Sequence, residues 1–412
     1  MEEVINTINK NMGDKLGYQS KRSSFVNRVI VSFLTVLCLL CTKIPAFISM
    51  NISFFSRYES YIIMVAFVAL LFFGLIQRSL SLEKNKLWFL SYIVILLLTT
   101  LYNNGNLMKM IYEIIKMMQF FLMFSVLIKI EKNACFKTLY YSSLLLLVLN
   151  FIYWVAFPNG LFFRDNIYYF FDTTNETPNY VIPLIVIVLL FLYKERRHSG
   201  IRKFIIPGAI IISNIAMLLS IDCSTGKVAI VLLFAMIVFS KIIVKWITPK
   251  TLFVIYIAFL ILIVFLRLQE LFSFIIVDIL GESLTLHTRT LAWDYAWQAF
   301  LQNPFFGKGY LTVDFKYSVI CEFTNGRFSH SHCEFYEILL RSGAFGVLCL
   351  GGYYMSIIRK IEKSYRESRV IQLLVFSIFV FLIMSVNETC FTAYFFMLLA
   401  LLENSKDIFE RL

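Results

Sequence analysis

The side chains best suited to chemistry gather in residues 286–346, the only long polar and aromatic interval of the chain. It holds His287, His330 and His332, together with the cations Arg289, Lys308, Lys316, Arg327 and Arg341. An imidazole can accept a proton near neutral pH. A guanidinium binds phosphate through two parallel hydrogen bonds. The interval therefore predicts proton transfer beside a bound phosphate group.

His332 is the candidate base. Ser331-His332-Cys333-Glu334 fits the S-x-x-E capping box, with Ser331 as the N-cap and Glu334 three residues later. This places His332 in the first helical turn, where free backbone N–H groups and the helix dipole attract phosphate and disfavour the imidazolium. The alternative is a first-turn residue at the water interface with no catalytic role. His330, two residues earlier, is a candidate for substrate binding.

Arg289 is the candidate phosphate ligand. It shares helical spacing with three aromatic residues, Trp293, Trp297 and Phe300, before Pro304 and the Gly307-Lys308-Gly309 turn end the segment. Such a helix favours the membrane–water interface. The alternative is that Arg289 only reaches lipid phosphates. Lys308, in the turn, is a second candidate to contact substrate.

Three further residues are candidates to bind substrate. Lys227 follows Ser224-Thr225-Gly226 at the start of an apolar run, where a helix N-terminus could hold phosphate, although the G-x-x-x-x-G-K of a P-loop is absent. Asn175 lies in the polar segment 172–179, which could bind sugar hydroxyls or simply form a turn before Pro178. Arg341 lies inside an apolar run, where it could face the cavity of His332 or pair with Glu337. Helical geometry, with His332 counted in the helix, puts Arg341 on the opposite face from His332.

Composition places these residues in a membrane protein. Hydrophobic residues make up 59% of the 412 residues, charged residues 16%, and mean hydropathy is +0.76. Soluble domains have about 45–50% apolar and about 25% charged residues. The sequence predicts an all-α, polytopic integral membrane protein with a single domain, 1–412, and about 12 transmembrane helices. The expected spans are 26–42, 60–77, 87–102, 107–128, 138–157, 178–193, 203–220, 227–247, 251–267, 333–358, 369–386 and 388–403.

Basic residues predict the orientation. Most of the 38 Lys and Arg residues fall in alternate loops, which places the N- and C-termini in the cytoplasm. Residues 268–332 then form a long external loop between the ninth and tenth spans, with short amphipathic helices in it. The +12 net charge follows from this topology, and no folded basic patch indicates nucleic-acid binding.

The cysteines and histidines indicate no metal or redox centre. A zinc site from His287, His330 and His332 is conceivable, but it lacks an H-x-x-x-H spacing or a C-x-x-C partner. The eight cysteines show no inferable pairing. We therefore expect neither a metal nor a cofactor.

The ordered motifs resemble the O-antigen polymerase and ligase family. The resemblance rests on Arg289 and Trp293, then Asn303-Pro304-Phe305-Phe306-Gly307-Lys308-Gly309, then His332, then Gly343-Ala344-Phe345-Gly346. These match an Arg before an amphipathic helix, an N-P-x-x-G-x-G turn, a His before a helix and a G-x-x-G. Cys333 departs from the Asn that often follows the His in this family, and Lys227 stands where an Arg is common.

The resemblance implies a membrane glycosyltransferase in the bacterial cytoplasmic membrane. It would polymerise polysaccharide repeat units, with an undecaprenyl-diphosphate-linked oligosaccharide as donor and the growing polysaccharide as partner. Arg289 and Lys227 would stabilise the leaving diphosphate, and His332 would take the acceptor proton. The flippase and the chain-length regulator of the same pathway are further expected partners. The alternatives are a ligase that transfers glycan to a lipid or protein, and a flippase or exporter of lipid-linked oligosaccharide.

Overall fold

The structure is a computed structural model that describes residues 25–40, 42–80, 85–163, 166–195, 202–268, 274, 289–311 and 318–409. It is 79% helical, as the apolar composition predicts. Among the described residues, five helices are long and apolar enough to cross a membrane, or six if a pair bent by 80° counts as one span. Five shorter apolar helices accompany them, so a count of twelve spans stays a prediction.

Helices cover nearly all of the expected apolar runs. The first is Phe25–Leu40. It is followed by α2 Ala46–Asn51, α3 Ser53–Ile76, α4 Lys86–Tyr102, α5 Leu107–Ala156, α6 Pro178–Glu195, α7 Arg202–Ser220, α8 Ser224–Val238, α9 Ser240–Trp246, α10 Pro249–Leu260, the π-helix η1 Ile261–Phe265, α11 Arg289–Leu301, α12 Val319–Phe323, α13 Glu334–Tyr365, α14 Arg369–Met384, α15 Ala393–Glu403 and α16 Ser405–Phe409. The expected spans 107–128 and 138–157 are merged in α5, a 50-residue helix with non-helical backbone at Glu131.

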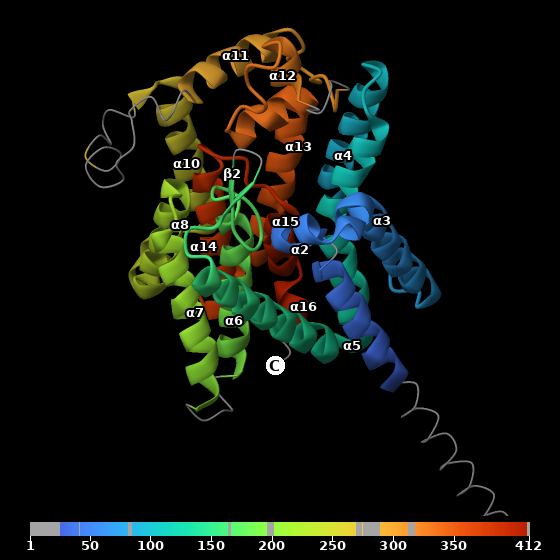
Figure 1. Cartoon of the computed structure of the whole chain (residues 1–412), viewed down its shortest axis with the longest axis vertical. Coiled ribbons are helices and arrows are strands. Elements are labelled where there is room, and N and C mark those ends of the chain that lie inside the picture. The colour runs from blue at the N-terminus through green and yellow to red at the C-terminus, as the bar shows by residue number, and fades with distance from the viewer. Residues whose placement is uncertain are drawn as a thin grey trace, which may run out of the picture.

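The helices α14 and α15 form the centre of the bundle (Figure 1). Nearly every residue of both is buried, because they are packed by α5, α6, α8, α10 and α13. An apolar helix that is buried all round belongs to a protein core. The segment that connects α14 to α15, residues 385–392, is longer than expected from the sequence, in which the predicted spans end at 386 and begin at 388. The eight-residue connection brings polar groups to the middle of one end of the molecule.

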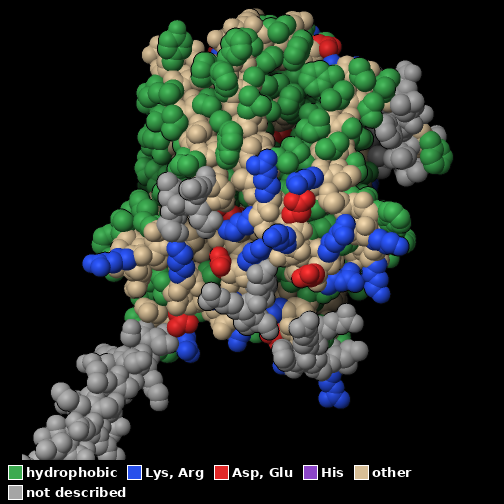
Figure 2. Space-filling view, turned by 180° about the vertical axis from the view of Figure 1, so that it is seen from behind, with side chains coloured by type: hydrophobic (Ala, Val, Ile, Leu, Met, Phe, Trp, Pro, Cys, Tyr) green, Lys and Arg blue, Asp and Glu red, His purple; other side chains and the backbone are tan. Residues whose placement is uncertain are grey.

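The two ends of the bundle differ. Figure 1 shows α11 and α12 across one end, and the C-terminus and the first residues of α7 at the other. Lys and Arg side chains gather in the half away from α11 on the face in Figure 2, and hydrophobic side chains cover the other half. This segregation agrees with the charge pattern from which the topology is predicted. The long 268–332 loop is only partly described, as α11 and α12 with short flanking segments.

Two glycine motifs lock this end together. The backbone of the 303–309 turn lies against α13 at its break: Ala344 N donates to Pro304 O at 2.8 Å, and Gly309 N donates to Arg341 O at 2.9 Å. Gly343 has φ +63° and a Cβ there would lie 2.2 Å from the Phe305 carbonyl. Glycine is therefore required by both conformation and contact. These motifs fix α11 relative to α13, and so position Arg289 relative to His332.

A short antiparallel hairpin precedes α6. It pairs β1, Leu161–Phe163, with β2, Asn166–Tyr168. The chain then runs through residues 169–177, whose backbone holds α2: Ala46 N donates to Phe171 O at 2.9 Å and Phe47 N to Phe170 O at 3.2 Å. The polar segment 172–179 is thereby held in a defined place beside the bundle.

Candidate active site at one end of the helix bundle

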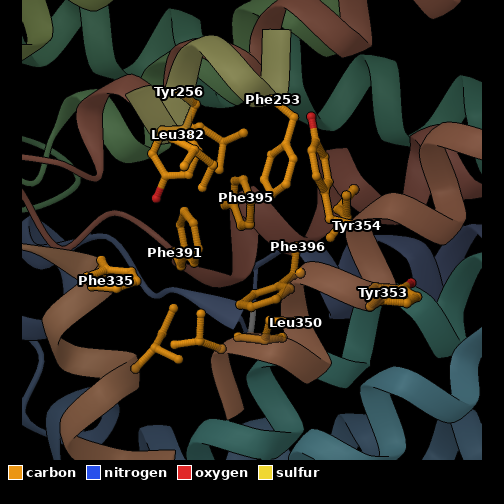
Figure 3. A pocket seen from close by; sticks show the side chains of 15 residues that line it. Phe253, Tyr256, Phe335, Leu350, Tyr353, Tyr354, Leu382, Phe391, Phe395 and Phe396 are labelled. Atoms are coloured by element: carbon orange, nitrogen blue, oxygen red, sulfur yellow. The ribbon is translucent and has the colours of Figure 1, made fainter. Parts of the chain in front are cut away.

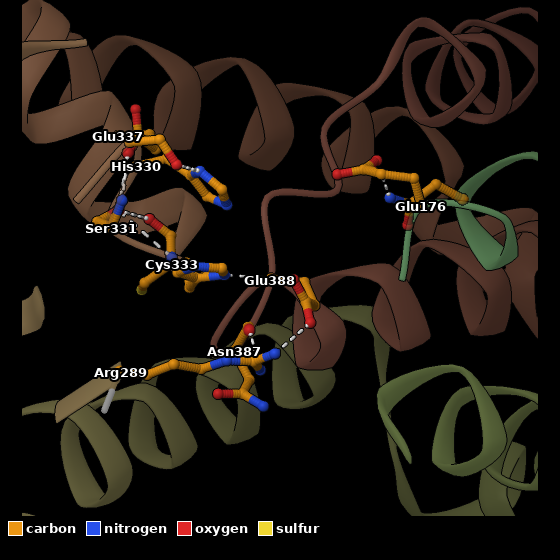
Figure 4. A network of polar contacts seen from close by, with 11 residues as sticks. Glu176, Arg289, His330, Ser331, Cys333, Glu337, Asn387 and Glu388 are labelled. Atoms are coloured by element: carbon orange, nitrogen blue, oxygen red, sulfur yellow. Dashed lines mark hydrogen bonds and ion pairs between the residues drawn. The ribbon is translucent and has the colours of Figure 1, made fainter. Parts of the chain in front are cut away.

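Glu388 is the centre of a polar cluster at the α11 end of the bundle. It lies in the α14–α15 connection and is 5% exposed. Its Oε1 accepts from Arg289 NH2 at 2.7 Å, and Arg289 NH1 donates to Asn387 O at 2.6 Å. Figure 4 shows Arg289 reaching this connection from α11. A guanidinium has five N–H donors, so Arg289 keeps donors for a ligand while two are engaged.

His332 faces the same carboxylate. Its Nδ1 lies 3.9 Å from Glu388 Oε2, and this nitrogen is buried with no hydrogen-bond partner among the described residues. The His332 side chain as a whole is 31% exposed. Catalytic hydrogen bonds are often long without substrate and tighten in the complex. A carboxylate at Nδ1 would leave Nε2 as the proton acceptor.

The capping box predicted for this segment is wrong. The helix begins at Glu334 with Cys333 as N-cap, so His332 precedes α13 and is not in its first turn. His332 has φ +54°, an uncommon backbone conformation for a residue with a side chain. Ser331 instead pairs with Glu337: its backbone N and its Oγ donate to Glu337 Oε1 at 2.8 and 2.9 Å. The helical argument that set His332 opposite Arg341 fails for the same reason.

Arg341 forms an ion pair with Glu337, which is the alternative that the sequence offers to a place in the cavity of His332. Its NH2 lies 2.8 Å from Glu337 Oε2, and its guanidinium lies over the Tyr310 ring at 5.1 Å. Glu337 is 1% exposed. Arg341 therefore neutralises the carboxylate that anchors Ser331. Through Glu337, Arg341 helps to hold Ser331 and the neighbouring His332 in place. A role of Arg341 in substrate binding stays a prediction.

His330 packs against His332, with ring centroids 3.9 Å apart. Its Nδ1 forms a hydrogen bond of 2.8 Å with Ser329 Oγ. Burial and the neighbouring His332 lower the pKa of His330 to about 4. A second charged imidazole is thereby disfavoured beside His332.

Lys227 lies in the first turn of α8, close to the cluster. Burial raises the pKa of the thiol of Cys223, the N-cap of α8, to about 12. This thiol also interacts electrostatically with Glu388, Arg289 and Lys227. The Lys227 ammonium is partly exposed and has no ion pair among the described residues. It is thus a cation available to an anionic ligand near Arg289.

Two other predicted residues, Asn175 and Lys308, form no hydrogen bond or ion pair with the cluster residues described above. Asn175 is exposed at the tip of the 172–179 segment. Lys308 donates to Gln302 Oε1 at 3.0 Å on the outside of the 303–309 turn. Among the described residues, no group of three or more His, Cys, Asp or Glu side chains is arranged for a metal, and the zinc alternative, which needs His287, is not tested. His287 lies outside the described residues.

An apolar pocket opens beside the cluster, between α10, α13, α14 and α15 (Figure 3). Aromatic side chains from α10, α13, α15 and the α14–α15 connection line it, among them Tyr256, Phe335, Phe391 and Phe395. Tyr256 accepts from Ser385 Oγ at 3.4 Å, and Phe391 follows Glu388 by three residues. The segment that carries Glu388 therefore also supplies Phe391 to the lining of the pocket.

Glu388 is the functional candidate that sequence reasoning missed. An acidic residue between two strongly apolar runs is a signal, because a charge at membrane depth is costly and usually has a partner. The sequence gives no means to see that this partner is Arg289, 99 residues away. Glu337 was identified only as the partner of Arg341, and its contact with Ser331 was not foreseen.

Residues 215–351 match the family model described as O-antigen ligase. The match covers Lys227, Arg289, His332 and the two glycine motifs, and confirms the resemblance over that part of the chain. Asn175 and Glu388 lie outside it. No curated protein and no solved structure matches the chain significantly. The apolar helices indicate a multi-pass membrane protein, and the matched region is similar to the O-antigen ligase family.

Proposed function

We propose that this protein polymerises undecaprenyl-diphosphate-linked polysaccharide repeat units at the outer face of the bacterial cytoplasmic membrane. One observation carries the proposal: the Glu388 carboxylate lies between Arg289 and His332, the phosphate ligand and the base expected from the sequence. A cation for the leaving group and a base for the acceptor thus share one buried anion. That arrangement suits transfer of a glycosyl group from a diphosphate.

In the proposed reaction, an acceptor sugar hydroxyl attacks the anomeric carbon of the donor. The bond from that carbon to the diphosphate oxygen breaks, and the hydroxyl proton passes to His332. Negative charge grows on the departing diphosphate, where Arg289 and Lys227 stabilise it. Glu388 holds both Arg289 and the His332 ring, and stabilises the imidazolium that forms.

The apolar pocket supports a lipid substrate. Its aromatic lining lies between helices of the membrane region and includes Phe391, three residues from Glu388 in the chain. An isoprenoid chain buried there would leave its diphosphate at the polar cluster. The burial of apolar chain contributes about 0.8 kcal/mol per CH₂ group, so the pocket would add affinity without taking part in the chemistry.

A ligase is the second candidate, because the matched family model is described as O-antigen ligase. The same cation and base would serve, and only the acceptor would differ. A flippase or exporter is disfavoured, because transporters usually place their substrate site near the bilayer midplane. Here the candidate site lies at one end of the bundle, beside α11.

The test is a deletion strain complemented with the wild-type gene. Surface glycan is resolved by gel electrophoresis. A polymerase predicts that deletion leaves single repeat units and that complementation restores the ladder of longer chains. A ligase predicts long chains that stay on the lipid carrier and never reach their final acceptor. Normal surface glycan in the deletion strain would contradict both.

A further inference from the structure

The polar segment before α6 carries a second set of groups that the proposed reaction does not use. Asn179 Nδ2 donates to Glu176 Oε2 at 2.9 Å. Asn179 is 1% exposed, and its Oδ1 has no hydrogen-bond partner among the described residues. A buried carbonyl without a partner is unfavourable unless a ligand or water satisfies it. This amide therefore points to a ligand.

The segment is held rigidly between its neighbours. Lys43 forms an ion pair with Asp172, and Thr173 N donates to Asp172 Oδ1 at 2.8 Å. On the other side, a Cβ at Gly226 would lie 2.5 Å from Pro178, so the start of α8 lies directly against this segment. Lys227, the free cation, is thus one residue from that contact. Glu176 and Asn179 are fixed next to the proposed diphosphate site.

Glu176 also faces the proposed catalytic cluster. Figure 4 shows Glu176 on the far side of Glu388 from Arg289. Burial and the charge of Asp172 raise the pKa of Glu176 to about 7, and Glu388 acts in the same direction. Near neutral pH this carboxyl exists in both forms, so it can accept or donate a hydrogen bond.

The chemistry of the segment selects its ligand. The carboxylate of Glu176 repels phosphate, so the diphosphate belongs with Arg289 and Lys227. Asp172 is already neutralised by Lys43, and the described residues contain no group of three or more His, Cys, Asp or Glu side chains that could hold a metal ion. A half-buried carboxyl beside an unsatisfied amide suits groups that donate and accept at once, which are hydroxyls.

We propose that Glu176 and Asn179 form a binding subsite for the hydroxyl groups of a sugar ring. The subsite deepens the proposed function and rests on it. It would hold either the sugar of the acceptor or the first sugar of the donor, on the side of Glu388 away from Arg289. It would set which hydroxyl meets His332, and so which linkage forms.

The experiment uses the full chain in nanodiscs with three probes. The first is the lipid-linked saccharide extracted from membranes of the deletion strain. The second is the free saccharide released from it by mild acid, which can act only as acceptor. The third is undecaprenyl diphosphate, which carries no sugar. Glu176→Gln preserves shape while it removes the carboxylate, and Asn179→Ala removes the amide. Glu322→Gln, an exposed glutamate on α12, is the matched control.

Glu176→Gln and Asn179→Ala are expected to raise KM for saccharide roughly 10-fold or more, since a hydrogen bond to a charged group is lost. Affinity for undecaprenyl diphosphate should stay at the wild-type value, which also shows that the variants are folded. A higher KM for the free saccharide would show that the subsite binds the acceptor sugar. A higher KM confined to the lipid-linked form would show that it binds the first sugar of the donor. Unchanged KM for both forms, as in Glu322→Gln, would overturn the subsite.

Failure of the proposed function gives a different pattern. A wild-type protein that neither elongates nor transfers saccharide counts against the polymerase and the ligase alike. In that case calorimetry of free saccharide still compares wild type with Glu176→Gln. Equal binding, or no binding to either, would then reject the subsite as well, and a loss confined to the variant would keep it.

Discussion

Arg289 NH2 and Glu388 Oε1 lie 2.7 Å apart, although 99 positions separate the two residues in the chain. Both side chains are largely shielded, at 15% and 7% exposure, so salt screens this pair weakly. Removing one partner of such a pair leaves the other charge buried, which is strongly destabilising. The contact ties α11 to the α14–α15 connection, and thereby ties the proposed phosphate ligand to the residue that faces His332.

Glu388→Gln is expected to reduce glycan extension strongly. The amide keeps the shape and an oxygen for Arg289, but it no longer stabilises a charged His332. Loss of the carboxylate that orients a catalytic histidine lowers the rate by about 10⁴-fold in the best-studied case, the serine-protease triad. The measurement is the length distribution of surface glycan, with Glu322→Gln as control. A normal ladder in Glu388→Gln would show that the carboxylate is only a structural anchor.

Arg289→Ala should abolish or severely reduce transfer, and Arg289→Lys should restore only part of it. A lysine can keep the ion pair with Glu388, but it cannot also supply paired donors to a phosphate. Binding of undecaprenyl diphosphate to protein in nanodiscs measures the effect directly. Immunoblots show how far loss of the ion pair lowers the membrane level of Arg289→Ala, and Arg289→Lys, which keeps the pair, separates binding from stability. Full activity in Arg289→Ala would leave the residue with only a structural role as the ion-pair partner of Glu388.

The part of this site that sequence predicts is the part carried by local motifs. Spacing around Arg289 predicts a helix that ends before Pro304, and α11 ends at Leu301. The break at Gly343 could not be predicted, because it depends on contact with Phe305. The capping box failed because Glu337 competes with Glu334 for Ser331, and Glu334 instead accepts from Phe391 N at 3.1 Å. Such choices are made by tertiary partners that spacing alone does not reveal.

His332→Ala is expected to leave membrane levels normal while cells make only single repeat units. Loss of a general base costs about 10²–10⁴-fold in rate. His332→Gln keeps a donor but cannot accept the proton, so it should bind undecaprenyl diphosphate and fail to extend glycan. His330→Ala should do much less, because its ring meets Ser329 rather than Glu388. Glycan of normal length in His332→Ala cells would make the assignment of the base wrong.

The predicted topology is tested by single cysteines in a background without reactive thiols. Asn325→Cys lies just after α12, and Lys203→Cys lies in the first turn of α7; both positions are exposed. An impermeant maleimide on intact cells should label the first and spare the second, because the charge pattern puts α12 outside. Permeabilised cells, in which both should react, are the control. Labelling of Lys203→Cys alone would reverse the orientation and move the site to the cytoplasm.

The acid sensitivity of the protein should depend on His330. Its pKa is about 4 in the folded chain, through burial and the neighbouring His332, against about 6.5 in an unfolded chain. Between these values the unfolded state binds a proton that the folded state excludes, so this residue lowers the free energy of unfolding as pH falls from 6.5 toward 4. Above about pH 6.5 it has no such effect. His330→Asn should therefore lose less Tm than wild type between pH 7.5 and pH 5, measured in detergent. Other groups, Glu176 among them, titrate in both proteins and largely cancel in the comparison. Equal losses of Tm would mean that His330 is not held neutral by burial.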